Sequence, residues 1–317
     1  MRNLLALGLL LFLVYACGDD DNGGAPSIPP RTLSEQLPED ETAIQEYLAT
    51  HFYNYEEFET PPADFDFRIR IDTIAGDNAD KTPLSQQISQ ATVLLSSSQL
   101  GLSEEEIDVP HTYYYLVARE GAGASPTVAD STLLKYEGRL LDGTPFDATI
   151  DFVWQQLPFT IRGYANAFTQ FKAGTDAAVI DNPGEIPEIP DSGIGLMVLP
   201  SALAYFNNPP NLIIPLYAPL VFTVELGLVV SNTDSDNDGI PNIEEDLNGN
   251  NYLFDDNTDA DFEADNFQRP SANFVDTDDD GDGIPTREEI SDTIGNIVTP
   301  FPDSNSDGVP DYLDPDN

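Results

Sequence analysis

Three acidic segments near the end of the chain carry the residue types and the spacing of a metal-binding loop. They begin at Asp234, Asp278 and Asp303, and each has acids or amides at positions 1, 3 and 5 and glycine at position 6. Oxygen ligands at positions 1, 3, 5, 9 and 12, with glycine for the sharp turn, are what a Ca²⁺ loop requires. The candidate ligands at positions 1, 3, 5 and 12 are Asp234, Asp236, Asp238 and Glu245, then Asp278, Asp280, Asp282 and Glu289, then Asp303, Asn305, Asp307 and Asp314.

The three segments also share proline at position 8 and an oxygen-bearing residue at position 9, which is Asn242, Thr286 or Asp311. This pattern resembles thrombospondin type 3 repeats, and residues 246–250 are a looser possible fourth loop. Bound Ca²⁺ would neutralise the repulsion between the carboxylates, so the expected role of the ion is structural. The alternative is a solvated acidic stalk that holds no metal.

The net charge limits the partners of the chain. The 317 residues include 12 Lys+Arg and 57 Asp+Glu, for a formal net charge of −45. Nucleic acid is excluded as a partner, because its binding needs basic side chains that displace counterions. A hydrophobic content of 40% predicts a packed core, and the length suggests about two folded units. Residues 231–317 carry −23 of the charge, so they are expected to form a separate acidic Ca²⁺-binding repeat segment.

The N-terminal residues predict a lipid anchor. Arg2 is followed by an apolar run to Val14, which is about half as long as a membrane span and resembles the core of a signal peptide over residues 1–17. The run ends in Val-Tyr-Ala-Cys17, which resembles a bacterial lipobox, so Cys17 is the expected site of lipidation. A free cysteine there by chance is the alternative. Because Cys17 is the only cysteine, internal disulfides and thiolate zinc cages are excluded.

The residues after Cys17 predict where the anchor places the chain. Gly18-Asp-Asp-Asp21 begins an expected flexible tether over residues 18–38 and is similar to the acidic export signal of Bacteroidetes surface lipoproteins. This resemblance implies an outer-membrane lipoprotein that faces outward. A periplasm-facing anchor is the alternative.

Residues 39–108 are expected to form an N-terminal extension that packs on the next domain. Thr42 and Gln45 fit a capping box for a helix over about 42–53, with His51 near its end as a surface residue rather than a ligand. Alternation over residues 65–71 predicts a strand. Residues 93–95 form a short apolar island in an otherwise polar stretch.

Residues 109–230 predict a small α+β domain. Strands are expected at 113–118, at 133–141 before an Asp-Gly turn, and at 220–230. Tyr164, Phe168 and Phe171 recur at helical spacing, with Gly174 as a candidate C-cap. Residues 175–195 contain several prolines and are expected to be an extra segment inserted into this domain.

Four blocks in this domain, in order, resemble the FKBP family of peptidyl-prolyl isomerases. They are Tyr136-x-Gly-x-Leu-x-Asp-Gly-x-x-Phe146-Asp147, then Ile161-Arg-Gly-Tyr164, then Leu199-Pro-x-x-Leu-Ala-Tyr205, and finally Ile213-Ile214-Pro with Leu220-x-Phe222-x-Val-Glu-Leu. The resemblance implies an antiparallel sheet wrapped on one short helix. It also implies isomerisation of X-Pro bonds in proline-containing polypeptide clients, without a catalytic cofactor.

The resemblance also implies which residues form the site. Asp147 would lie at the rim beside the twisting carbonyl, and the Tyr205 hydroxyl and the Ile161 backbone N–H would point at substrate carbonyls. The remaining wall residues would be Tyr136, Phe146, Tyr164, Ile213, Ile214 and Phe222. The alternative is that these aromatic residues are only core.

Several residues depart from the family pattern at or near the expected site. Tyr164 stands where the family usually has Trp, and Phe206 replaces a glycine and is able to plug the site. Either Trp154 or Phe159 supplies a further wall aromatic. No G-x-S-x-G or H-E-x-x-H motif is present, and rotation about an imide needs neither nucleophile nor metal. The alternative function is a weak or inactive FKBP scaffold that serves as a surface binding or chaperone module on a Ca²⁺-stabilised stalk.

Overall fold

The structure is a computed structural model that describes residues 30–180, 188–266 and 269–316. The chain divides into two units, Met1–Pro30 and Arg31–Asn317, and the description below concerns the second unit. The predictions for Cys17, for the signal peptide and for residues 18–29 lie outside the described residues. No helix in the described ranges has the length and apolar character needed to span a bilayer.

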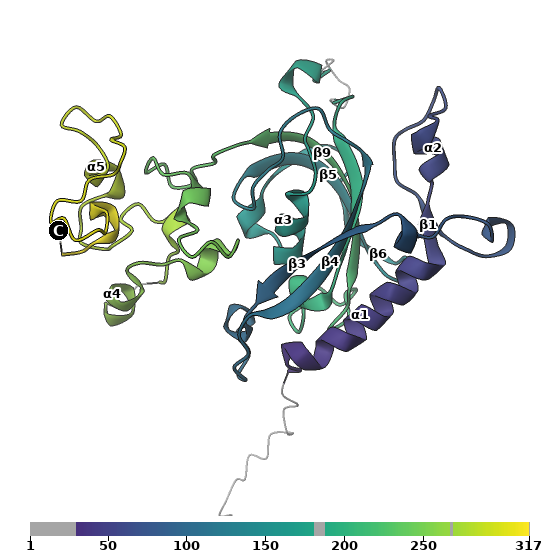
Figure 1. Cartoon of the computed structure of the whole chain (residues 1–317), viewed down its shortest axis with the longest axis horizontal. Helices are drawn as coiled ribbons and strands as arrows, with labels where there is room; N and C mark the ends of the chain where they lie inside the picture. Colours follow the sequence, from purple (N-terminus) through teal and green to yellow (C-terminus); the bar gives the residue numbers. More distant parts are fainter. Residues whose placement is uncertain (1–29, 181–187, 267–268, 317) are drawn as a thin grey trace, which may run out of the picture. The chain divides into compact units, whose positions relative to one another are not determined.

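An antiparallel sheet of seven strands, wrapped on one short helix, forms the centre of the second unit (Figure 1). The strand order is β3-β4-β8-β9-β5-β6, and β7 also pairs with β5. The predicted fold class is confirmed. The elements are β3 (Ser89–Leu95), β4 (Val109–Arg119), β5 (Ser131–Leu140), β6 (Pro145–Ala148), β7 (Val153–Gln156), β8 (Gly193–Leu199), β9 (Leu220–Val230) and the helix α3 (Arg162–Phe168).

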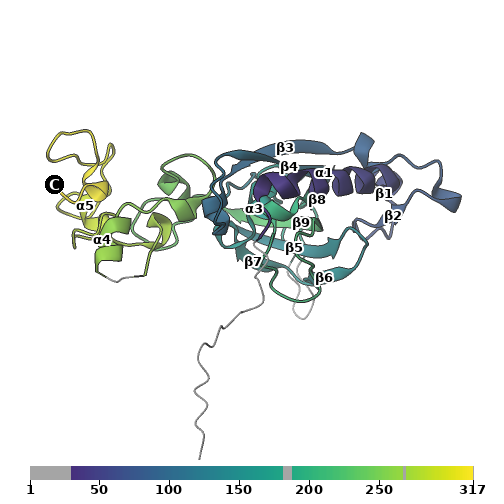
Figure 2. The same ribbon diagram turned by 90° about the horizontal axis from the view of Figure 1, so that it is seen from below.

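The two faces of the sheet are covered by different helices (Figure 1). On one face, Phe168 and Phe171 pack with Leu134 and Leu199 in the larger core around α3. On the other face lies the helix α1 (Leu33–Thr50), which Figure 2 shows running along the sheet. Its apolar residues Ile44, Tyr47 and Leu48 pack on Leu116, Leu196, Val198 and Val221 of the strands. Because both faces are covered, every residue of β8 is buried.

Helix α1 begins nine residues before the predicted start. Thr32 is its N-cap and forms a capping box with Glu35, so the expected capping box of Thr42 and Gln45 is wrong. Thr42 lies within the helix and its hydroxyl donates to the Pro38 carbonyl at 2.7 Å. Residues 33–38 are therefore helical rather than tether. The sequence pattern did not predict this first part of the helix, because Pro38 lies within it and proline normally interrupts a helix.

The predicted strand over residues 65–71 is also wrong. Only β2 (Ile71–Thr73) is a strand there, and it pairs with β1 (His51–Tyr53) in a separate two-stranded sheet; the helix α2 (Tyr55–Glu59) follows β1. Phe65 packs instead on Phe58 and Phe67, with ring centroids 5.0 and 4.9 Å apart, and Phe67 has a φ of +53°. A segment with alternating apolar residues forms a strand only where a partner strand is available. Residues 65–67 have none among the described residues, and their aromatic side chains form a cluster instead.

The other local predictions hold in part. The predicted strands at 113–118, 133–141 and 220–230 correspond to β4, β5 and β9, and His51 lies at the C-cap of α1, stacked on Tyr47. Gly174 is not a helix cap, because α3 ends at Phe168. Its N–H instead donates to the Gly227 carbonyl at 2.7 Å, and an added Cβ there would lie 2.6 Å from an Asp191 oxygen. The glycine is needed for this close approach.

The described residues of the acidic segment, 231–266 and 269–316, form loops and short helical turns. Ile240, Ile290 and Tyr312, one from each acidic segment, make a small core that joins the three. The short helices here are α4 (Ala260–Asp265) and α5 (Thr286–Glu289), with 3₁₀ turns at Asn242–Glu245, Leu253–Asp255, Asn273–Val275 and Asp311–Leu313.

Candidate functional site

An aromatic hollow with a volume of about 350 Å³ lies on the α3 side of the sheet. Its walls come from β5, β6, β9, α3 and the segments around them, so residues far apart in sequence meet there. Seven of the nine predicted site residues line it, together with three others. The lining residues are Tyr136, Phe146, Asp147, Gln155, Phe159, Thr160, Ile161, Tyr164, Tyr205 and Phe222, and we call this set the aromatic hollow.

The rings of the aromatic hollow pack edge to face. Phe222 lies 5.6 Å from Phe146 and 5.2 Å from Tyr164, and Tyr136 lies 6.1 Å from Tyr164, measured between ring centroids. Edge-to-face pairs at these distances fix ring positions without filling the space between them. The walls are therefore held in place by one another as well as by the strands that carry them.

The polar side chains of the aromatic hollow are three phenols, one carboxylate, one amide and the hydroxyl of Thr160. The Tyr136 hydroxyl donates to Asp147 at 2.6 Å, and the Tyr164 hydroxyl donates to the Gln155 side-chain oxygen at 3.1 Å. Burial raises the pKa of Tyr136, Tyr164 and Tyr205, and the hydrogen bond to Asp147 raises that of Tyr136 further. All three phenols are therefore neutral hydrogen-bond donors near neutral pH.

Ile213 and Ile214 do not line the aromatic hollow. Ile214 is buried in the main core, and Ile213 is 49% exposed. The Asn211 side-chain oxygen accepts from both of their backbone N–H groups, at 2.8 and 3.2 Å. This turn directs the two side chains to different surroundings, which their shared apolar type did not reveal.

Two questions left open by the sequence are answered by position. Phe159 lines the aromatic hollow, whereas Trp154 lies on β7, is 55% exposed and takes no part in it. Phe206 does not plug the hollow: it is buried against Tyr217, with ring centroids 4.9 Å apart. Its φ of +48° explains why glycine suits this position.

Gln155 and Thr160 line the aromatic hollow although the sequence did not point to them. Gln155 explains how tyrosine replaces tryptophan at position 164, because its side chain gives the buried hydroxyl an acceptor. Neutral polar residues of this kind leave no signal in spacing or charge.

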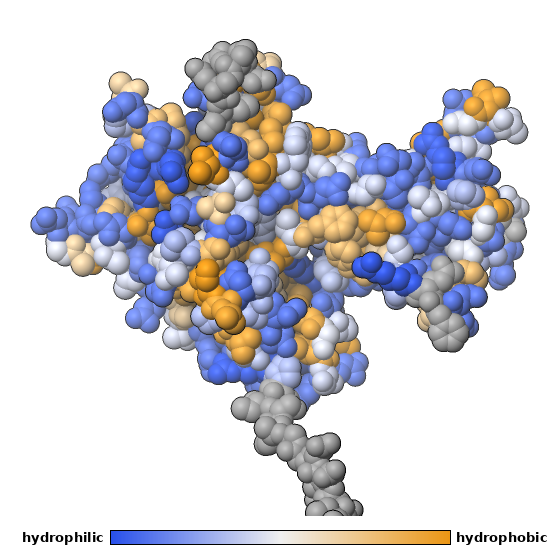
Figure 3. Space-filling view, turned by 180° about the vertical axis from the view of Figure 1, so that it is seen from behind, coloured by the Kyte–Doolittle hydropathy of each residue, from blue (hydrophilic) through white to orange (hydrophobic). Residues whose placement is uncertain are grey.

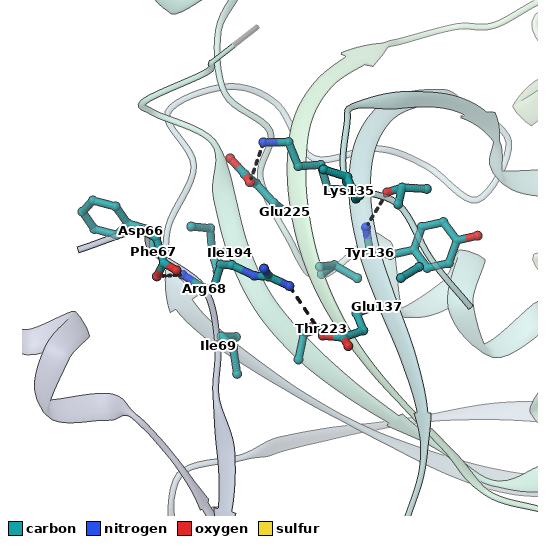
Figure 4. A pocket seen from close by; sticks show the side chains of 14 residues that line it. Asp66, Phe67, Arg68, Ile69, Lys135, Tyr136, Glu137, Ile194, Thr223 and Glu225 are labelled. Atoms are coloured by element: carbon teal, nitrogen blue, oxygen red, sulfur yellow. Dashed lines mark hydrogen bonds and ion pairs between the residues drawn. The ribbon is translucent and has the colours of Figure 1, made fainter. Parts of the chain in front are cut away.

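Exposed apolar groups gather in patches on an otherwise polar surface (Figure 3). A second hollow, of about 260 Å³, lies on the opposite side of β5 and β9 (Figure 4). It is lined by charges that pair with one another: Lys135 with Glu225 at 3.3 Å and Arg68 with Glu137 at 3.8 Å. The Tyr136 ring points away from these pairs. This second hollow therefore differs from the aromatic hollow in having ion pairs along its walls.

The three acidic segments adopt the same turn. Gly239, Gly283 and Gly308 at position 6 have φ between +94° and +108°, and each N–H donates at 3.1 Å to the aspartate at position 1. The N–H at position 7 donates in each to the position 5 carboxylate. The looser fourth loop repeats this turn, because the Asn251 N–H donates to Asp246 at 2.9 Å.

The carboxylates in these turns suit a hard cation. Ligand oxygens of Asp234, Asp236 and Asp238 lie within 4.8 Å of one another, as do those of Asp278, Asp280 and Asp282. Buried oxygens of Asp236, Asp238, Asp278 and Asp280 have no hydrogen-bond partner among the described residues. Burial and neighbouring carboxylates raise the pKa of Asp236 to about 7, and burial, with Asp234 nearby, raises that of Asp238 to about 6. A bound divalent cation would supply the missing partners.

The side chains at position 9 make a common contact within the turns. Each accepts a hydrogen bond from the backbone N–H at position 2 of its own segment. The pairs are Ser235 to Asn242 at 2.9 Å, Asp279 to Thr286 at 3.1 Å and Ser304 to Asp311 at 2.6 Å. Position 9 therefore ties the two ends of each turn together.

Comparisons with known proteins find a family model and a curated protein that match parts of this chain. Residues 235–302 match the family described as BamM C-terminal. The peptidyl-prolyl cis-trans isomerase Mip of Coxiella burnetii is 38% identical over 63 residues, which are 19% of this chain and 27% of Mip. The chain thus spans about a quarter of the length of this curated relative.

Two solved structures also match the chain. A peptidyl-prolyl cis-trans isomerase of Pseudomonas syringae pv. tomato is 26% identical and matches 37% of this chain and 74% of its own, with a TM-score of 0.30. FkpA of Escherichia coli is 28% identical and matches 37% of this chain and 47% of its own, with the same TM-score. The fold assignment rests on the strand order and the helix described above.

Proposed function

We propose that the chain is an FKBP-type peptidyl-prolyl cis-trans isomerase that acts in the aromatic hollow. The observation that carries this proposal is the shape and chemistry of the hollow: about 350 Å³, walled by aromatic and aliphatic side chains, with a few polar tips. The four sequence blocks and the identity with Mip support it. Phe206 packs elsewhere and leaves the site open.

Such a site needs no covalent chemistry. Rotation of an X-Pro imide has a barrier of about 18–20 kcal/mol, which arises from resonance between the carbonyl and the nitrogen. Water stabilises the planar, charge-separated form, so an apolar hollow that excludes water favours the twisted form. Catalysis then follows from tighter binding of the twisted state than of the planar one.

Each group has a part in this mechanism. The prolyl ring would lie among Phe146, Tyr164 and Phe222, and the Tyr205 hydroxyl would donate to a substrate carbonyl. Asp147, fixed by Tyr136, would lie beside the twisting carbonyl. Ile161 is the N-cap of α3, which places its backbone at the edge of the hollow.

The experiment is exchange NMR of an X-Pro peptide with the full chain. Phe146→Ala removes an aromatic wall of the hollow. Burial of apolar surface against such a side chain contributes about 1.5–3 kcal/mol, so kcat/KM should fall about ten- to a hundredfold. Trp154→Ala is the matched control, because it removes a larger aromatic residue outside the hollow. If the intact protein binds the peptide without accelerating exchange, the alternative of an inactive binding scaffold is favoured.

We also propose that the acidic segments bind structural Ca²⁺ through positions 1, 3, 5 and 12. The unpartnered buried oxygens support this role. Calorimetric titration of the full chain with CaCl₂ tests it. A flat titration would favour the alternative, a solvated acidic stalk that holds no metal.

The clients and the location are proposed from the N-terminal sequence motifs. We propose that Cys17 is lipidated and anchors the protein in the outer membrane, facing outward, where it acts on envelope or surface proteins. Labelling with a fatty-acid analogue, lost in Cys17→Ala, tests the anchor. Digestion of intact cells by external protease separates an outward from a periplasmic position.

A further inference from the structure

Asp279 is the second residue of the second acidic segment, and its carboxylate is buried without a partner. It is 1% exposed, and neither oxygen has a hydrogen bond within the described residues. Position 2 of the other two segments is serine, Ser235 and Ser304. The turn of the second segment therefore does not require an acid at this position.

The Asp279 carboxylate faces the first segment. Its ligand oxygen lies within 4.8 Å of those of Asp238 and Glu245, which are positions 5 and 12 of the first segment. Both Glu245 oxygens and one of Asp238 are also buried and unpartnered among the described residues. Three carboxylates from two segments thus meet in one buried cluster that contains five oxygens without hydrogen bonds.

The first segment lacks a ligand that Asp279 is placed to supply. The side chain at its position 9, Asn242, is occupied by hydrogen bonds to Ser235 and to the Ala129 carbonyl at 3.0 Å. Ca²⁺ takes six to eight oxygen ligands and prefers carboxylates. An ion held by the first turn would reach a fuller ligand set by including Asp279.

The position of Asp279 is fixed by its backbone. Its N–H donates to the Thr286 hydroxyl, and the core of Ile240, Ile290 and Tyr312 holds the segments against one another. The carboxylate is thus directed at the first segment before any ion binds. Holding like charges in this way costs stability unless a cation neutralises them.

We propose that Asp279 completes the Ca²⁺ site of the first acidic segment, so that a single ion bridges the first and second segments. This inference rests on the proposed binding of Ca²⁺ by the acidic segments. It assigns a ligand outside the twelve-residue loop and makes the folding of the two segments depend on each other.

The test is calorimetric titration of the full chain with CaCl₂ in three forms: wild type, Asp279→Asn and Asp261→Asn. Asp261 is an exposed acid of the same region, so its variant controls for the loss of one charge. We expect Asp279→Asn to weaken one site at least tenfold and Asp261→Asn to leave all sites unchanged. Equal titrations of the two variants would overturn the bridging role.

Melting temperature gives a second readout with a change of sign. In excess chelator, Asp279→Asn should melt above the wild type, because it removes a buried unpaired charge; in saturating Ca²⁺ it should melt below. A variant that melts lower under both conditions by the same amount contradicts the proposal. Both measurements are repeated on Asp279→Ser. Serine is the residue at this position in the other two segments, so the turn is known to accept it. A wild type that binds no Ca²⁺ would instead refute the Ca²⁺ proposal itself.

Discussion

The polar tips of the aromatic hollow differ in the bonds that they already make. The hydroxyls of Tyr136 and Tyr164 donate to Asp147 and Gln155, whereas that of Tyr205 makes no hydrogen bond within the described residues. Tyr205 is therefore the phenol available to a substrate carbonyl. This position agrees with the role proposed for Tyr205 above.

Tyr205→Phe should lower kcat/KM by about tenfold or less, because one hydrogen bond contributes about 0.5–1.5 kcal/mol. The fold should remain unaffected, since no internal bond is lost. Tyr217→Phe is the control for the rate, as its ring packs on Phe206 outside the hollow; its hydroxyl accepts from the Arg31 N–H at 3.0 Å, so its melting temperature is measured as well. Exchange NMR at several peptide concentrations measures the effect, and a Tyr205→Phe rate equal to that of the control would remove this hydroxyl from the mechanism.

A buried histidine predicts how stability changes with pH. His111 on β4 is fully buried, its Nδ1 lies 2.9 Å from the Val109 carbonyl, and Nε2 has no partner among the described residues. Burial lowers its pKa from 6.5, with smaller effects from Val109, Glu106 and Arg162. Since the unfolded chain takes up a proton first, stability should be complete above about pH 6.5 and fall as the pH drops below it.

Melting curves from pH 7.5 to 5.5 in saturating Ca²⁺ check this expectation. His111→Gln should flatten the decline, which has a limit of about 1.4 kcal/mol per pH unit for one group. His51→Gln is the control, because His51 lies at the partly exposed end of α1. A slope that His111→Gln leaves unchanged would assign the pH dependence to other groups.

At the scale of elements, α1 is tied to the loop that carries Tyr205. Asp40 is buried in α1 and accepts from both the N–H and the hydroxyl of Ser201, each at 2.7 Å, and from Gln36. Burial is the main cause that raises the pKa of Asp40. A helix from the N-terminal extension thus orders a turn next to the candidate site.

Asp40→Ala should cost about 1–3 kcal/mol in the free energy of unfolding, since it leaves buried donors without an acceptor. Urea denaturation measures this loss. Glu39→Ala is the neighbouring control, where an exposed ion pair with Arg31 is removed and a change of at most about 1 kcal/mol is expected. Equal losses in the two variants would show that the hydrogen bonds between Asp40 and Ser201 stabilise the fold no more than an exposed ion pair does.

The elements that the sequence predicted well have one buried and one open face. Alternation or helical spacing appears there, as in β5 and β9. It is absent in β8, because both of its faces are buried, and this strand was missed. The segment at 65–71 shows the reverse error, since its alternation serves an aromatic cluster rather than pairing.

The site was predictable to the extent that its residues belong to motifs. Seven residues of the four blocks line one hollow, while Gln155 and Thr160 come from a stretch without a motif. The displacement of Ile213 and the hydrogen bonds at position 9 depend on the local turn. Such turns are set by tertiary contacts that residue types alone do not encode.

At the scale of the whole molecule, Arg162 connects the two proposed functions. This first residue of α3 donates to the Asn250 carbonyl at 3.1 Å and lies 4.9 Å from the Tyr252 ring centroid. Asn242 similarly donates to the Ala129 carbonyl. Hydrogen bonds thus connect the acidic residues after 231 to the domain that holds the hollow. Ordering of the acidic residues by Ca²⁺ should therefore affect the stability of that domain as well.

Removal of Ca²⁺ should lower the melting temperature of the full chain, and most strongly at low salt. The 231–317 region carries a charge of −23, and its repulsion is screened over about 10 Å at 0.1 M salt. Raising NaCl in excess chelator should therefore recover part of the loss, whereas salt should matter little with Ca²⁺ bound. Scanning calorimetry in both series measures this, and a salt response that Ca²⁺ leaves unchanged would count against neutralisation.

The strand β3 comes from the N-terminal extension and pairs with β4 along its whole length, from Ser89 opposite Tyr115 to Leu95 opposite Val109. A chain trimmed to begin at residue 109 would present the bare hydrogen-bonding groups of β4 to any neighbour. Such an edge recruits strands from other molecules. The extension therefore protects this edge from self-association. Variants that lack it should form oligomers or aggregates at temperatures below their unfolding transition.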